Sequence, residues 1–200
     1  MRRTLGLVIV VSSSMAAAEP ADSVSSAIGA RESDQGIGAE IGVAAGGSVT
    51  PGGLRVAGHY LYQMSATDWF DGVASFTYGG DTTGCYTDRM ATAMCDHGLT
   101  AGSGVEIAAT VRRMFPAQGA FQPFARLGIG VAIARFSADD VVGIGLPVHA
   151  GGGVRARVAP AVSIVAQAEL SVGVGAYSHD LGAEPLIGMA VTAGADFELR

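Results

Sequence analysis

The sequence contains no lysine, and all 12 of its basic residues are arginines. Charged residues make up only 15% of the chain, against about 25% in ordinary soluble domains. A surface that meets bulk water usually carries many charged residues of both signs, such as lysine and glutamate. This chain has too few of them for such a surface. Because the net charge is −6 and no basic cluster is present, we expect no nucleic-acid partner.

Long hydrophobic runs are also missing. A membrane-spanning helix needs about 20 consecutive apolar residues, and no stretch of the chain reaches that length. Yet 49% of the residues are hydrophobic and the mean hydropathy is +0.38. A transmembrane β-barrel reconciles the two observations, because its apolar residues are dispersed into alternating strand segments.

The N-terminus has the features of an export signal. Arg2 and Arg3 precede an apolar stretch at 5–11, and Ala16-Ala17-Ala18 forms an A-x-A cleavage pattern. We therefore predict a cleavable signal peptide over residues 1–18. Residues 19–35 are small and polar and are predicted to form a flexible periplasmic leader, which leaves residues 36–200 for the barrel.

The rest of the chain alternates between apolar and polar or tiny residues, with the period of two that is typical of β-strands. In SIVAQAELSVGVGAY, every second residue from Ile164 to Ala176 is apolar, and most of the others are polar or glycine. The pattern predicts eight strands, within the segments 36–46, 54–64, 69–78, 104–115, 121–136, 146–159, 163–177 and 186–199.

The predicted connections alternate in length. Those near 65–67, 116–119 and 159–161 are tight, and those near 46–53, 79–103, 137–145 and 178–185 are longer. An even number of strands with short turns at one end is the layout of an outer-membrane barrel with both termini in the periplasm. Interfacial aromatic girdles are predicted near the turns (Trp69, Phe70, Phe115) and near the loops (Tyr78, Tyr177).

The two faces of each strand are assigned from composition. A soluble lipocalin-like carrier would have the same alternation with its polar face in water, but here that face is glycine-rich with isolated charges. We therefore expect the apolar face to meet lipid and the polar face to line the lumen. The predicted interior residues are Glu40, Arg55, His59, Asp71, Glu106, Arg112, Arg126, His149, Arg155, Arg157, Glu169, Asp196 and Glu198.

Buried charges need partners, and arginine forks suit buried carboxylates. Arg155 and Glu169, on adjacent predicted strands, are the expected best pair. We expect these groups to form a structural network that fills the lumen, since eight strands leave little room inside. A narrow channel for ions or solutes is the alternative, because the many interior glycines leave space for water.

The C-terminal stretch TAGADFEL carries a family resemblance. Thr192, Gly194, Phe197 and Leu199 match the polar-x-Gly-x-x-apolar-x-apolar ending of the small eight-stranded outer-membrane β-barrels, such as the transmembrane domain of outer-membrane protein A. FQPFARLGIGV (121–131) is similar to the fifth-strand region of such barrels. The resemblance implies an all-β, antiparallel up-and-down transmembrane barrel whose ending is read by the barrel-assembly machinery. Arg200 departs from it, because many members end on an aromatic residue.

Two cysteines, Cys85 and Cys95, lie in the longest predicted loop. Export places them in an oxidising compartment, so a disulfide that closes the loop is expected. Metal binding with Asp96 and His97, or free thiols, are the alternatives, although the spacing does not match a zinc site.

An enzyme that modifies lipid A is a further alternative. The loops hold Asp96-His97 and His179-Asp180, together with Ser103 and Ser178, but no nucleophile motif frames them. We therefore expect no catalytic residue, metal or cofactor. The sequence predicts an exported integral outer-membrane barrel that interacts with lipid, and with an unidentified ligand or partner through its extracellular loops.

Overall fold

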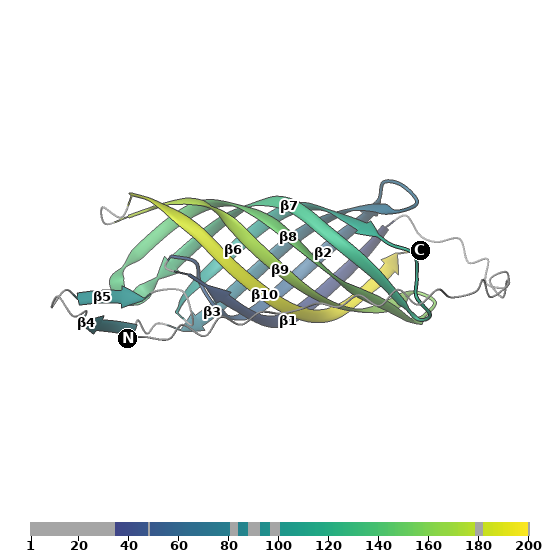
Figure 1. Ribbon diagram of the computed structural model, residues 1–200, viewed down its shortest axis with the longest axis horizontal. Coiled ribbons are helices and arrows are strands. Elements are labelled where there is room, and N and C mark those ends of the chain that lie inside the picture. The colour runs from purple at the N-terminus through teal and green to yellow at the C-terminus, as the bar shows by residue number, and fades with distance from the viewer. Residues whose placement is uncertain are drawn as a thin grey trace, which may run out of the picture. The chain divides into compact units, whose positions relative to one another are not determined.

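The computed structural model describes residues 35–47, 49–80, 84–87, 93–96, 101–178 and 182–199. The predicted signal peptide and almost all of the predicted leader lie outside these ranges. Eight antiparallel strands close into a barrel around one lumen, with their axes tilted (Figure 1). They are β1 (Gln35–Gly46), β2 (Gly53–Gln63), β3 (Asp68–Gly80), β6 (Gly102–Met114), β7 (Phe121–Phe136), β8 (Val141–Ala159), β9 (Val162–Tyr177) and β10 (Gly182–Leu199).

The topology is the predicted up-and-down meander. Each strand pairs with the next barrel strand along the chain, and β1 pairs with β10 to close the barrel. A two-stranded hairpin of β4 (Gly84–Thr87) and β5 (Ala93–Asp96) is inserted between β3 and β6. A short 3₁₀ helix, η1 (Ser137–Asp139), connects β7 to β8. No helix within the described ranges is long and apolar enough to span a membrane.

The two ends of the barrel differ. We call the end with Gln35 and Leu199 the terminal end, and the opposite end, which carries the 81–101 connection, the loop end. The connections at the terminal end are short, as predicted. Two of the predicted longer loops are wrong, however, because β8 begins at Val141 and β10 at Gly182, which leaves only 137–140 and 178–181 between strands.

On all eight strands apolar side chains cover the outer face, and most of the charged side chains point inward. The outer face is a continuous apolar surface that includes Ile41, Val56, Phe76, Ile107, Ile129, Leu146, Leu170 and Val191. This confirms the predicted polarity of the faces. Two girdle predictions are wrong, since Trp69 and Tyr177 are buried inside the barrel, where the Tyr177 hydroxyl donates to the Val49 carbonyl at 2.8 Å.

Glycine explains how large polar side chains fit into so narrow a lumen. Gly194 lies opposite Glu40 across the β1–β10 seam, and Gly151 lies opposite Glu169 across the β8–β9 pair. A Cβ atom on Gly194 would lie 2.0 Å from the carbonyl oxygen of Ala39, and one on Gly151 would lie 2.5 Å from that of Ala168. The abundance of glycine, 30 of 200 residues, therefore includes positions where the barrel wall has no room for a side chain.

We predict that Gly194→Ala destabilises the barrel by about 1–3 kcal/mol, because the added methyl group collides with backbone atoms that cannot rotate away. Gly58→Ala is the matched control, since Gly58 lies on the outer face of β2 with no atom within 4 Å of an added Cβ. Urea unfolding in detergent micelles measures both variants. Equal stability of the two would contradict the steric role of Gly194.

Candidate functional site in the lumen

The lumen has three layers, with apolar side chains near each end and a charged network between them. Among the described residues, the network contains five carboxylates, three guanidinium groups and two imidazoles, and each of the eight barrel strands contributes at least one of them. Its members are Glu40, Arg55, His59, Asp71, Glu106, Arg112, Arg126, His149, Glu169 and Asp196. The sequence placed all of these side chains inside.

Arg112 is the centre of the half of the network that lies toward the terminal end. Its guanidinium donates to Asp71 Oδ2 at 3.0 Å and to Asp196 Oδ2 at 2.9 Å, and it lies 4.7 Å from the centroid of the Phe124 ring. The side chain is fully buried (0% exposed). One cation thus ties β3 to β10 across the lumen, and it is desolvated on every side.

Glu169 is the centre of the other half. Its carboxylate lies 3.1 Å from His149 Nδ1, 3.4 Å from Arg126 Nη1 and 3.8 Å from Arg55 Nη2. Arg55 also lies 3.4 Å from Glu106. The expected pair of Arg155 with Glu169 is therefore wrong. The β8–β9 register places Gly151 opposite Glu169 and Arg155 opposite Val165, four residues further along the strand.

Each buried histidine lies between two carboxylates. His59 Nδ1 is 2.9 Å from Asp71 and its Nε2 is 3.4 Å from Glu40, while His149 Nδ1 is 3.1 Å from Glu169 and its Nε2 is 3.4 Å from Glu106. Each imidazole thus links carboxylates from two different strands, β1 and β3 for His59 and β6 and β9 for His149.

Glu40 is held by neutral groups as well. Gln167 Nε2 and Thr192 Oγ1 each donate to Glu40 Oε2 at 2.7 Å. Thr192 and Gly194, two residues of the predicted assembly signal, therefore also serve the β1–β10 seam. Phe197 and Leu199, the other two, are exposed on the outer face.

Apolar side chains fill the lumen at both ends of the network. Val49, Ala134, Phe136, Val141, Tyr177 and Leu186 form the cluster at the loop end. Leu61, Trp69, Met114, Phe124 and Val165 form the cluster toward the terminal end. The cavity between charged residues in the middle has a volume of only about 10 Å³. The sequence analysis missed these clusters, although apolar residues on the inward parity near strand ends mark them.

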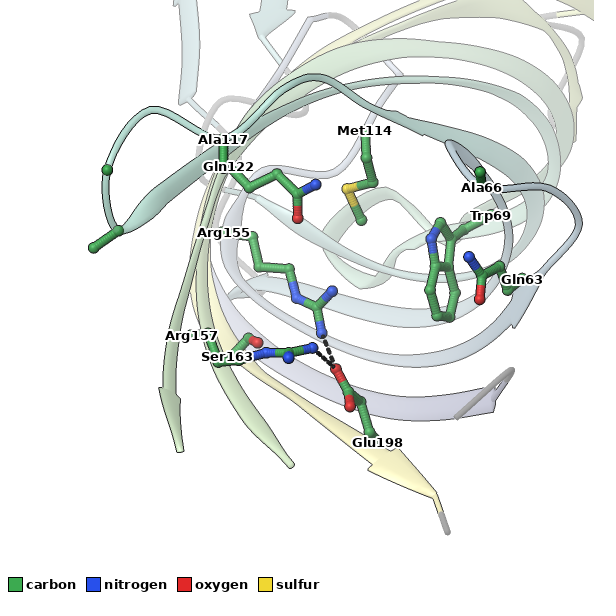
Figure 2. A pocket seen from close by; sticks show the side chains of 12 residues that line it. Gln63, Ala66, Trp69, Met114, Ala117, Gln122, Arg155, Arg157, Ser163 and Glu198 are labelled. Carbon is green, nitrogen blue, oxygen red and sulfur yellow. Dashed lines mark hydrogen bonds and ion pairs between the residues drawn. The ribbon is translucent and has the colours of Figure 1, made fainter. Parts of the chain in front are cut away.

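A third ionic group lies beyond the second cluster, at the mouth of the terminal end. Arg155 Nη2 donates to Glu198 Oε1 at 3.0 Å, and Arg157 donates to the same oxygen (Figure 2). Arg157 was predicted to be inside, but its side chain is half-exposed, since β8 bulges at 157–159 where it leaves the barrel. These residues line a pocket of about 260 Å³.

The remaining predicted sites lie partly outside the described ranges. His97, His179 and Asp180 are among the residues that the structure does not describe. Ser178 is described, and its hydroxyl accepts a hydrogen bond from the Val142 amide at 3.0 Å. Within the described residues, no group of three His, Cys, Asp or Glu side chains is arranged to hold a metal ion.

Comparison with solved structures shows the same architecture elsewhere. Neisserial surface protein A superposes with a TM-score of 0.58 at 15% identity, over 84% of this chain and 98% of that one. The chain has the fold of a small outer-membrane β-barrel. The Yersinia pestis outer membrane protein Ail, in a phospholipid bilayer nanodisc, gives a TM-score of 0.41 at 17% identity, over 84% of this chain and all of that one. No protein-family model and no curated protein matches the sequence.

We predict that Arg112→Met destabilises the barrel by about 3–5 kcal/mol, because it leaves Asp71 and Asp196 buried without their shared cation. Arg113→Met is the control on the next residue. The Arg113 side chain is 62% exposed and bonds Asp68 at the barrel rim, so its loss should cost far less stability than the loss of Arg112. Urea unfolding of the folded barrels would contradict the prediction if the two variants lost similar stability.

Proposed function

We propose that the protein is an integral outer-membrane β-barrel, exported and non-enzymatic, with a sealed lumen and a structural or surface-interaction role through its loop end. The observation that carries this proposal is the distribution of side chains on the barrel wall. Every strand presents apolar side chains outward, and the ten ionisable groups of the network lie inside. In water this arrangement would expose a large contiguous apolar surface, whereas in a bilayer it meets hydrocarbon.

The aromatic residues support the same placement. Tyr60, Tyr62, Phe115, Phe121 and Phe197 are exposed on the outer face toward the terminal end. Toward the loop end, Phe76 and Tyr78 stack on the outer face with ring centroids 6.5 Å apart. Belts of aromatic side chains at both ends of an apolar band are typical of a membrane-spanning barrel. In outer-membrane barrels the short turns face the periplasm, so the short connections at the terminal end support a periplasmic position for it.

The loop end would then face the cell exterior, where the 81–101 connection is the longest element outside the barrel wall. The surface-interaction role is assigned to this segment, because the other connections at that end are short. Its hairpin register pairs Cys85 directly with Cys95. Opposite positions on antiparallel strands have Cα atoms about 4.5–5.5 Å apart, which is within the range that a disulfide spans.

The geometry weighs against the alternatives that the sequence left open. A lipocalin-like carrier needs an apolar lumen, and this lumen is filled with paired charges. A channel needs a continuous wet path, and buried apolar clusters lie in the lumen on both sides of the charged network. For a lipid A-modifying enzyme, the candidate loop residues His97, His179 and Asp180 lie outside the described ranges.

We predict that Ile129→Arg impairs membrane insertion. Ile129 lies mid-strand in β7 with 66% of its surface exposed. An arginine at such a position is nearly neutral in water but costs about 2–4 kcal/mol at the middle of a bilayer. Gln118→Arg, in the exposed 115–120 turn, is the control. The folded fraction in lipid vesicles is measured by the mobility shift of unboiled samples in SDS gels.

The proposal fails if the wild-type protein fractionates without detergent as a soluble species, shows no heat-dependent shift, and tolerates Ile129→Arg as well as Gln118→Arg. It stands if the wild type is extracted from outer membranes with a heat-dependent shift and only Ile129→Arg reduces the folded fraction.

We also predict that Cys85 and Cys95 form a disulfide in the exported protein. Under denaturing conditions a maleimide should add no mass to the protein before reduction and two labels after it. Cys85→Ser, which frees the partner thiol, should take one label without reduction. Two labels on the unreduced wild type would exclude the disulfide.

A further inference from the structure

The pocket at the mouth of the terminal end has two unlike walls. Trp69 and Met114 form an apolar wall, and Arg155, Arg157, Glu198 and Ser163 form a polar one, with their side chains turned toward the same opening (Figure 2). The volume of about 260 Å³ is near the lower end of the range for small-molecule sites, about 300–1,000 Å³. An apolar wall with a few convergent polar groups is the usual build of such a site.

Two polar atoms of this wall have no partner in the protein. Ser163 is 1% exposed, and its Oγ makes no hydrogen bond. The Nε of Arg155 is likewise buried and unbonded, although its Nη2 binds Glu198. Buried polar groups are almost always satisfied, because an unpaired one is costly. Two unsatisfied donors along one pocket therefore point to an acceptor supplied from outside the chain.

The charged side chains at the mouth also favour an acceptor from outside the chain. Two guanidinium groups converge on one oxygen of Glu198. Guanidinium groups bind the oxygens of carboxylates and phosphates through charge-assisted hydrogen bonds, so the missing acceptor is best supplied by an anion.

We propose that this mouth is a binding site for a small organic anion. Its carboxylate or phosphate oxygens accept from Arg155 and Ser163, and its apolar part packs against Trp69 and Met114. The site is blind, because the cluster of Leu61, Trp69, Met114, Phe124 and Val165 closes its inner side. The ligand therefore binds from the terminal end and leaves by the same opening.

Trp69 is the only tryptophan of the chain, so its fluorescence reports directly on the pocket. We would titrate the folded barrel in detergent micelles with pentanoate, pentyl phosphate and pentanol at constant ionic strength. We expect a saturable change with the anions at concentrations at least about tenfold below those needed for pentanol, since one charge-assisted contact corresponds to about that factor. The order of the two anions identifies the preferred acid group.

Variants locate the binding group. Arg155→Gln should weaken anion binding about tenfold and leave the response to pentanol unchanged, and Ser163→Ala should weaken it less. Arg113→Gln is the control, because Arg113 lies at the same end but outside the lumen. Each variant is first checked for the heat-dependent shift in SDS gels.

The proposal is overturned if no probe gives a saturable change, if pentanol matches the anions, or if folded Arg155→Gln binds them like the wild type. If Arg155→Gln does not fold, two other results test the proposal. They are the preference of the wild type for the anions over pentanol and the weaker anion binding of Ser163→Ala. The periplasmic direction of the mouth rests on the proposed function, but the binding does not. If the protein fails the membrane-insertion test with Ile129→Arg but still binds anions, only the periplasmic direction of the mouth is refuted.

Discussion

The pairing of charges inside a narrow lumen is the constraint on which the rest of this barrel depends. Eight strands enclose just enough space for their own side chains, so every carboxylate that points inward must find its cation within that space. The Arg112 guanidinium between Asp71 and Asp196 meets this demand with two hydrogen bonds from one group. A lysine ammonium lacks the planar fork that reaches two carboxylates at once, which gives a physical reason for the exclusive use of arginine.

The same constraint accounts for the glycines. A long inward side chain is accommodated when the neighbouring strand has nothing at that level, as where Gly194 lies opposite Glu40 and Gly151 opposite Glu169. Small and large residues thus alternate around the lumen as well as along each strand. The cost is a loss of strand propensity at each glycine, which the closed hydrogen-bonded wall and the ionic network offset.

Much of this architecture follows from the period of two. Alternation fixed the eight strands and the side of the wall on which each charged residue lies, because strand parity is a local property. It could not fix which charges meet, since that depends on the register between tilted strands. The expected pair of Arg155 with Glu169 fails for this reason, because the two residues lie four positions apart in the β8–β9 ladder.

Aromatic residues near strand ends show the other limit of sequence reasoning. Trp69 and Phe70 are neighbours at the start of β3, yet Trp69 closes the lumen and Phe70 lies on the outer side of the wall. Composition suggested one interfacial girdle for both, whereas parity alone separates them. Applied strictly, parity would also have placed Tyr177 and Phe136 inside and so revealed the apolar clusters.

The physical requirements on the sequence differ between the outer face, the charged network and the two ends of the barrel. The outer face requires only apolarity, and the network requires matched charge and volume, so many sequences satisfy both. A shared fold at 15% identity with another small barrel is consistent with such a weak requirement. Buried apolar clusters lie on both sides of the network in the lumen. The two ends of the barrel are therefore where we propose that ligands bind, at the 81–101 segment and at the pocket around Trp69 and Arg155.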